Sequence, residues 1–480
     1  MKTKNIFFAY VMTLTSIRVY AQNGEWTLEQ FRNEIRSKNT LFKTYDKSRE
    51  ISELKLKTGD LVLTPIFFMS AGYLSDKKQP NQLTANESSA QKYSLGFSKK
   101  FSSGTNIKIS GDLSEAKNNG IQSPLFSSYE KYSVGSLGLS LSQSLLKDSF
   151  GELTSVRRER EDVQKKLEEL STDIQERQLY LEAEFLFWDT IYTDAEVKQR
   201  EASLQRATKI ENWIQKRYSD GIADKADFMN AKALKATREL QLIASLDDQK
   251  SLQRKVRDFI ESAEKNSIPR FKGDLNEMRS LSFYLPKTND FTKIDVQASI
   301  LEQALKKTVL KEVIANQKSD LQLSASYNTN AYDATKSATA LVGDLSKTDT
   351  PTAQIALTWT YVLDSEEKKA LTLQNEKELQ LSQLKLQRKK IESVSYWEEL
   401  SRRYNELTSK ISAMTKVTEF QRERAKAEQD KLAKGRSITS QVITSEQEAS
   451  DSELTLLKLK AEQRKLEGQG LLFIQNRESL

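Results

Sequence analysis

The sequence contains few side chains equipped for bond-making chemistry. It has no cysteine and no histidine among its 480 residues, which removes the thiol nucleophile, the imidazole base and most ligand sets for transition metals. The reactive groups that remain are carboxylates and amines, since charged residues make up 29% of the chain. On the outer faces of helices such charges are usually solvated. We therefore expect a protein that is not an enzyme and that uses no metal and no cofactor.

Charged residues stand out beside two glycines that occupy equivalent places in the chain. Gly221 and Gly435 are 214 residues apart (435 − 221), and the same shift brings Glu239 onto Glu453 and Phe259 onto Phe473. An internal repeat of this kind determines the architecture. The two copies differ in charge, because the first glycine has acidic neighbours and the second has basic or uncharged ones. Near Gly221 stand Asp220, Asp224 and Asp227 with the apolar Ile222, and near Gly435 stand Lys434 and Arg436 with the uncharged Gln441 and Thr444.

Each of these glycines interrupts a long helical segment. Apart from Gly221, residues 152–263 contain no glycine or proline, and the same holds for residues 352–467 around Gly435. Apolar residues recur every seven positions in the first segment, at Leu167, Ile174, Leu181, Trp188 and Ala195. A sustained heptad predicts supercoiled helix packing. Because glycine accepts a positive φ, each glycine is expected to form the turn of a helical hairpin.

Before each hairpin the pattern changes to period two. Leu137, Leu139 and Leu141 alternate with small residues, among them Ser136, Ser140 and Ser142, and similar runs occur within residues 66–145 and 321–362. This alternation predicts strands with one apolar and one polar face. The first copy has four strand candidates and the second has two, the additional hairpin being residues 91–116. A soluble sandwich and a membrane barrel account for these strands equally well.

The N-terminus has the features of an export signal. Lys2 and Lys4 precede a mainly apolar run over residues 6–17, and Ala21 ends a small-residue cleavage pattern. Cleavage after Ala21 removes three positive charges and lowers the net charge from +7 to +4 (7 − 3). A charge this small does not indicate binding to nucleic acid.

These signals divide the chain into a signal peptide, two structural repeats and a connector. The predicted limits are 1–21 for the signal peptide, 22–263 for the first repeat, 264–290 for the connector and 291–480 for the second repeat. Within the first repeat we expect a helix over 26–58, strands over about 66–145 and a helical hairpin over 151–263. Within the second we expect a helix over 291–317, strands over about 321–362 and a hairpin over 365–475.

The order helix, strands and long helical hairpin, repeated once, resembles the TolC family of outer-membrane efflux proteins (outer membrane factors). Residues 27–30 (TLEQ) resemble the opening helix of the family, residues 139–145 its passage from strand to helix, and Arg217 and Tyr218 with Gly221 its helical turn. The family usually has a proline where this chain has Ser144 and Val362. The resemblance implies a fold that is mainly α with a membrane β-barrel portion, in which an internally duplicated protomer assembles as a trimeric α/β-barrel channel. Four strands per protomer are usual in the family, and the sequence leaves four or six open.

The resemblance also implies a function and partners. It predicts a homotrimeric channel-tunnel, exported by the signal peptide to the outer membrane of a Gram-negative bacterium and extending into the periplasm, in contact with outer-membrane lipid. Solutes would pass passively through a gate, as part of a tripartite efflux system with a periplasmic adaptor (membrane fusion) protein and an inner-membrane transporter. The adaptor would dock on the helical turns, which correspond here to Asp220, Gly221 and Ile222 and to Lys434, Gly435 and Arg436.

Family members also carry aspartates near these turns, which line a narrow aperture. In the first copy Asp227 matches such a position, with Asp220 and Asp224 nearby, and in the second copy the matching positions are Gln441 and Thr444. Threefold symmetry would multiply each charge by three, so the uncharged residues would change the field in the pore. We expect an entrance that is less selective for cations, or one held shut by pairs of aspartate with Lys434 or Arg436.

Other functions also fit parts of the sequence. The same channel is suited to a type I protein secretion system. An exported structural coiled-coil protein would explain the heptads but not the strands or the paired turns. A periplasmic adaptor would contain one helical hairpin beside a compact β-rich domain, whereas this chain has two copies of the whole pattern.

Overall fold

The chain is described by a computed structural model over residues 25–77, 87–121, 125, 130–261, 270–277, 281, 292–347, 349–363 and 365–473. The predicted signal peptide and most of the predicted connector lie outside these residues. The chain forms two compact units. We call Met1–Phe42, Leu179–Phe283 and Leu400–Gly470 the helical unit, and Lys43–Gln178, Tyr284–Glu399 and Leu471–Leu480 the sheet unit.

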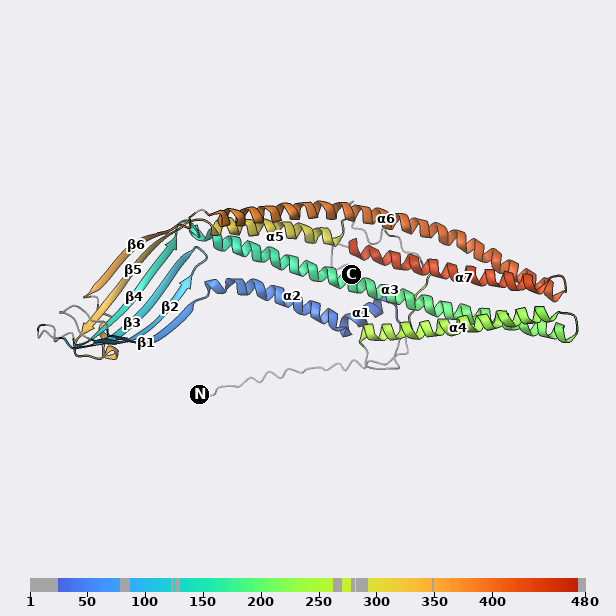
Figure 1. Ribbon diagram of the computed structural model, residues 1–480, viewed down its shortest axis with the longest axis horizontal. Helices are drawn as coiled ribbons and strands as arrows, with labels where there is room; N and C mark the ends of the chain where they lie inside the picture. The colour runs from blue at the N-terminus through green and yellow to red at the C-terminus, as the bar shows by residue number, and fades with distance from the viewer. Residues whose placement is uncertain are drawn as a thin grey trace, which may run out of the picture. The chain divides into compact units, whose positions relative to one another are not determined.

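The sheet unit contains a six-stranded antiparallel sheet in which the strands follow one another in sequence order (Figure 1). The strands are β1 (Ile66–Asp76), β2 (Glu87–Lys100), β3 (Thr105–Asn119), β4 (Lys131–Ser144), β5 (Asp320–Asp333) and β6 (Pro351–Thr360). Four strands come from the first copy and two from the second. The hairpin β2–β3, which the sequence analysis identified as additional, lies inside the sheet between β1 and β4.

The register gives this sheet one apolar and one polar face. Ile109 pairs with Leu139, and Leu139 pairs with Tyr327, so apolar side chains align across neighbouring strands. On the opposite face Lys108 pairs with Ser140, which pairs with Ser326. Side chains of one face recur at every second residue of a strand. The period-two pattern of the sequence is therefore realised as two distinct faces.

The remaining elements are mainly helical. The α-helices are α1 (Leu28–Lys38), α2 (Thr40–Gly59), α3 (Glu152–Ser219), α4 (Lys225–Ile260), α5 (Ile294–Asn316), α6 (Glu366–Ala433) and α7 (Thr439–Gly468). Short 3-10 helices are η1 (Asp60–Leu63), η3 (Ser149–Gly151), η5 (Ala338–Asp344) and η6 (Gln469–Phe473). This order of helix, strands and helical hairpin, present twice, confirms the predicted fold class for the protomer. No helix in the described part of the chain combines the length and the hydropathy needed to cross a lipid bilayer.

In the sheet unit, ion pairs connect α5 to the helices on either side of it. Arg157 and Arg160 of α3 contact Glu312 of α5 at 3.1 and 2.8 Å. Lys306 of α5 contacts Glu378 of α6 at 2.7 Å. Charged side chains beside the apolar seams of packed helices select the neighbouring helix and its orientation. Some of the charged side chains of this chain therefore form ion pairs between helices and are not simply solvated.

The first helix differs from the prediction. A single helix was predicted over 26–58, whereas the structure has α1 and α2 with a break at Asn39. Asn39 has an extended backbone, and its Oδ1 accepts a hydrogen bond from Leu41 N (2.8 Å) as a helix N-cap. Its Nδ2 donates to Phe259 O (2.7 Å) at the end of α4. The break is thus stabilised by a carbonyl group 220 residues away, which the local sequence does not indicate.

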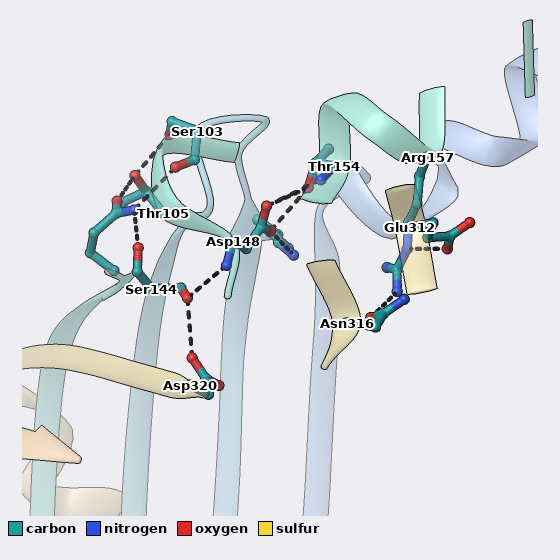
Figure 2. Close-up of polar contacts among 11 residues, drawn as sticks. Ser103, Thr105, Ser144, Asp148, Thr154, Arg157, Glu312, Asn316 and Asp320 are labelled. Carbon is teal, nitrogen blue, oxygen red and sulfur yellow. Dashed lines mark hydrogen bonds and ion pairs between the residues drawn. The ribbon is translucent and has the colours of Figure 1, made fainter. Parts of the chain in front are cut away.

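The passage from β4 to α3 is stabilised by polar side chains where the family usually has a proline (Figure 2). Ser144 Oγ accepts a hydrogen bond from Asp148 N and donates one to Asp320 Oδ1, both at 3.1 Å. Asp148 in turn accepts a hydrogen bond from Thr154 N (3.1 Å) and forms an ion pair with Lys100 (2.8 Å). Although burial acts in the opposite direction, these contacts lower the pKa of Asp148. A proline would fix φ at this position, whereas here the passage is held by a hydrogen-bond network.

Two glycines allow the β2–β3 turn to pack closely beneath this passage. Gly104 and Gly151 have φ of +77° and +84°. A Cβ atom on Gly151 would lie 1.7 Å from Ser102 O, and one on Gly104 would lie 2.4 Å from Asp148 O. Because both obstacles are backbone atoms, neither can move as a side chain would. The turn of the additional hairpin is therefore fitted against the start of α3.

Candidate functional site

The turns at Gly221 and Gly435 have the same hydrogen-bond pattern. Gly221 N donates to Tyr218 O (3.1 Å) and Ile222 N donates to Arg217 O (2.8 Å). The second copy repeats this, with Gly435 N bonded to Leu432 O (3.0 Å) and Arg436 N bonded to Lys431 O (2.8 Å). The two glycines have φ of +71° and +69°. Each helix therefore ends in a Schellman motif with glycine in the left-handed conformation.

The residues predicted to dock a partner all lie at the surface. Asp220, Gly221 and Ile222 are exposed in the first turn, as are Lys434, Gly435 and Arg436 in the second. No atom lies within 4 Å of the position of a Cβ on either glycine. Ile222 is a large apolar side chain that is 63% exposed. The turns thus present open backbone and the exposed side chain of Ile222. Glycine is needed at both positions because of the positive φ and not because a neighbouring atom would clash with a side chain.

The helices that follow the turns begin at equivalent positions with different charges. Asp224 precedes α4 and Ile438 precedes α7, both with extended backbone, and neither side chain caps its helix. Asp227 adds an acidic group to the first turn of α4, whereas the first turn of α7 has none. Negative charge is favourable at a helix N-terminus. The charge difference noted in the sequence therefore lies at corresponding helix starts.

Of the four predicted aperture residues, Asp227, Gln441 and Thr444 lie on these helices and Asp224 immediately precedes α4. Asp224, Gln441 and Thr444 are exposed and Asp227 is partly exposed. Ser437 Oγ lies 3.3 Å from Gln441 Oε1 and donates to Glu428 Oε2 at 2.6 Å. Within the protomer, these described residues show no ion pair between Asp220, Asp224 or Asp227 and Lys434 or Arg436. Pairing between subunits remains a prediction.

An apolar core joins the two hairpins beneath their turns. Leu432 and Val442 of the second hairpin pack with residues of the first, namely Ala207, Ile210, Ile214, Phe228, Ala231 and Leu234. The ring of Tyr218 stacks on that of Phe228, with the ring centroids 5.4 Å apart. Arg217 lies over the Trp213 ring at 4.6 Å, and its Nη1 is 3.5 Å from Leu432 O. The two turns therefore belong to a single packed tip.

The helical unit also contains a buried ionic cluster that the sequence analysis did not identify. Arg206 of α3 forms ion pairs with Glu446 and Glu453 of α7, the second at 3.3 Å. Glu446 is 1% exposed and Glu453 is 6% exposed. Arg422 of α6 also contacts Glu453, at 2.5 Å. The signal in the sequence was the seven-residue spacing of the two glutamates, which places them on one face of α7.

Burial changes the protonation properties of this ionic cluster. Burial raises the pKa of Glu446, and the nearby Arg206 only partly offsets this effect. Beside the cluster, burial also lowers the pKa of Arg238 of α4, which is 3% exposed and donates to Gln241 at 2.8 Å. Removing a charged group from water disfavours its charged form. The ionic cluster therefore joins α3, α6 and α7, although burying its charged groups costs free energy.

These features together define a fold: two copies of helix, strands and glycine-turned hairpin, with the strands merged into one sheet and the turns into one tip. It is the fold of the TolC-type outer-membrane efflux channels. The outer membrane protein VceC from Vibrio cholerae shares it with a TM-score of 0.68 and 11% identity, covering 92% of this chain and 95% of VceC. CusC matches with a TM-score of 0.69 and 12% identity over 95% of each chain. The open state of the Neisseria gonorrhoeae MtrE outer membrane channel matches with a TM-score of 0.61 and 14% identity. The match covers 93% of this chain and 88% of MtrE.

Comparison with protein-family models and with curated protein sequences gives no match. The described residues contain no group of three or more histidine, cysteine, aspartate or glutamate side chains arranged to hold a metal ion. The likeness to solved structures therefore establishes the fold.

Proposed function

We propose that this chain is the protomer of a trimeric outer-membrane channel-tunnel for passive, gated export of solutes. The observation that carries the proposal is the pair of equivalent exposed glycine turns, packed as one tip within a TolC-type fold. The protein works in the outer membrane, with its helices extending into the periplasm, after export by its signal peptide. Its partners are a periplasmic adaptor protein and an inner-membrane transporter, which form a tripartite efflux system with it.

Exposed apolar side chains on the helices support assembly with further copies. Leu240 and Ile243 on α4 are 68% and 64% exposed. On α6, Leu384 and Ile391 lie seven residues apart and are similarly exposed. Apolar positions repeated at heptad spacing and open to solvent mark helix-packing surfaces. Neighbouring protomers of the trimer would cover them.

The docking role of the turns is tested by replacing Ile222 with aspartate. The side chain is exposed and contributes nothing to the tip core, so we expect the trimer to assemble normally. Loss of an apolar interface contact of about 1.4 kcal/mol weakens binding about tenfold, so efflux in cells should fall strongly. Susceptibility of cells to effluxed compounds and the yield of heat-modifiable trimer in the outer membrane are the two measurements.

Ile222→Leu is the matched control and should retain efflux, since it keeps an apolar side chain of similar size. If Ile222→Asp assembles and exports as well as the natural protein, this turn does not dock a partner.

The aperture hypothesis predicts a change in ion selectivity. With Asp224 and Asp227 in one copy but Gln441 and Thr444 in the other, the entrance has fewer acidic groups than two acidic copies would provide. We expect Gln441→Glu to raise the permeability ratio of cations to anions severalfold, because it adds three negative charges to the ring. Reversal potentials in planar bilayers measure this ratio, and the effect should weaken in high salt.

Ser440→Glu is the control. It adds the same charge one position earlier in α7, where the side chain lies on a different face of the helix. Equal shifts for the two variants would show that position 441 does not line the aperture. Strong cation selectivity that is abolished only by Asp227→Ala would contradict closure by pairs of aspartate with Lys434 or Arg436.

A further inference from the structure

The two edge strands of the sheet lack the features that normally protect an edge. β1 has no charged residue before Asp76, and β6 has none at all. The charged residues lie in the interior strands, such as Lys92 in β2 and Lys108 in β3. Natural edges are usually protected by charges, prolines or bulges, and Pro351 stands only at the first residue of β6. Both edges are therefore suited to pairing with a further strand.

Exposure is greatest at these same edges. Met69 of β1 is 78% exposed and Ile355 of β6 is 80% exposed, compared with 51% for Leu139 in the middle of the sheet. All three side chains lie on the apolar face. The edge residues lack a neighbour on one side, and a strand placed there would cover that side.

The strand order permits identical copies to continue the sheet. All neighbouring strands are antiparallel, so β6, the sixth strand, runs opposite to β1. β6 of one copy can therefore pair antiparallel with β1 of the next, and the two strands have similar lengths of 10 and 11 residues. An even number of strands per copy lets a ring of copies close without a parallel pair.

We propose that β6 of each protomer pairs with β1 of the next, so that three copies close one sheet of eighteen strands (3 × 6). This inference rests on the trimer of the proposed function, and it specifies the width of the channel where the sheet encloses it. At a strand spacing of about 4.8 Å and a tilt of about 40°, eighteen strands give a backbone diameter of about 36 Å, compared with about 24 Å for twelve. The exit thus admits bulky cargo, including polymers and peptides about 25 Å across.

The polar face is suited to line such an exit. Along most of β4 it presents small residues, namely Ser136, Gly138, Ser140, Ser142 and Ser144, which leave the lumen open there, and the larger Tyr132 and Val134 lie on the same face at the start of the strand. The described part of the β5–β6 connection lies on the other side of the sheet. Its Leu341 and Leu345 pack on Ala331 and Leu113 of the apolar face, and Gly135 leaves room for Leu345 there.

Disulfide cross-linking in the full-length protein tests the proposed pairing. The chain has no native cysteine, so Leu357→Cys can be combined with Phe67→Cys, Met69→Cys or Ala71→Cys, which scan the register on the apolar face. We expect at least one pair to yield covalent trimers in the outer membrane under oxidation. Combinations with Phe68→Cys or Ser70→Cys, on the polar face, should not cross-link.

Cross-links within one chain between β1 and β4, for example between Met69→Cys and Leu139→Cys or its neighbours on that face, would overturn the proposal. They would show that β2–β3 leaves the sheet and that four strands per copy remain. Failure of all β1–β6 pairs in an assembled trimer would overturn it equally.

Polymer exclusion measures the exit directly. Neutral polyethylene glycols of graded size are added only on the side of the bilayer at which the sheet opens, so that the narrow tip does not limit their entry. We expect polymers up to about 25 Å across to lower the conductance, and a cut-off near 14 Å would overturn the proposal. Deletion of residues 87–119 should reduce the cut-off to that smaller value. A trimer that conducts with the small cut-off contradicts only the eighteen strands, whereas absence of trimer and conductance contradicts the proposed function itself.

Discussion

Replacing Arg206 by methionine is expected to destabilise the helical unit by about 3–5 kcal/mol at neutral pH, because a buried carboxylate without its cation is costly. Arg206 contacts both Glu446 and Glu453. Glu453 retains its contact with Arg422, so the carboxylate that loses its ion pair is that of Glu446. Chemical unfolding followed by circular dichroism on the purified protein measures the loss.

Arg424→Met is the matched control. Arg424 forms an ion pair of 2.5 Å with Glu448 in the same unit, but both side chains are exposed. Exposed ion pairs contribute less than about 1 kcal/mol to stability, so the free energy of unfolding of this variant should be close to that of the natural protein. Equal losses for the two variants would show that the buried pair has no special importance.

The pH dependence identifies Glu446 as the group responsible. Its pKa is raised above the ordinary value of 4.5 in the folded protein. A carboxyl group with a raised folded pKa stabilises the fold below its unfolded pKa, and this contribution is lost as pH rises through the folded pKa. Without Arg206 the pKa rises further, so the difference between Arg206→Met and the natural protein should shrink on acidification towards 4.5. The double variant Arg206→Met with Glu446→Gln should recover most of the stability at neutral pH, and a difference independent of pH would contradict this explanation.

Replacing Gly151 by alanine is expected to be the most damaging single-methyl change in the sheet unit. The left-handed backbone alone costs a non-glycine residue about 1–2 kcal/mol. At Gly151 the new Cβ would also meet Ser102 O at 1.7 Å, which forces the β2–β3 turn away from the start of α3. We expect a total loss above about 4 kcal/mol, in the range that marks a specific structural defect, and little folded trimer in the outer membrane.

Gly221→Ala separates the two contributions. Gly221 has a similar φ of +71°, but no atom lies within 4 Å of its Cβ position. This variant should therefore show only the backbone cost and should still form trimers. The yield of heat-modifiable trimer and the unfolding midpoint compare the variants, and equal effects at Gly151 and Gly221 would contradict the close packing.

The architecture followed from patterns that depend on local geometry. Helices and strands were predictable because side chains recur with periods of 3.6 and 2 on one face of each element. The two glycine turns were predictable because a positive φ at a helix end favours glycine. The strand-to-helix passage was harder to predict, because Ser144 acts there through hydrogen bonds to Asp148 and Asp320.

The features that the sequence did not reveal depend on contacts between distant residues. Asn39 ends a helix because it binds a carbonyl group of α4, whereas the same residue type is tolerated within helices. Glu446 and Glu453 carry the charge of solvated residues in the sequence, and only the packing of α7 against α3 and α6 buries them. The predicted docking and aperture residues lie at and just after the two glycine turns. Their roles in docking and in the aperture stay predictions.

The most direct test of the channel is the conductance in planar bilayers of the protein purified from the outer-membrane fraction. The proposed function predicts discrete, long-lived conductance steps from a species that migrates as a trimer. On heating it converts to a monomer slightly smaller than the 54.8 kDa of the full chain, because the signal peptide has been removed. A protein recovered as a monomer from the soluble periplasmic fraction, with no conductance after reconstitution, would contradict it.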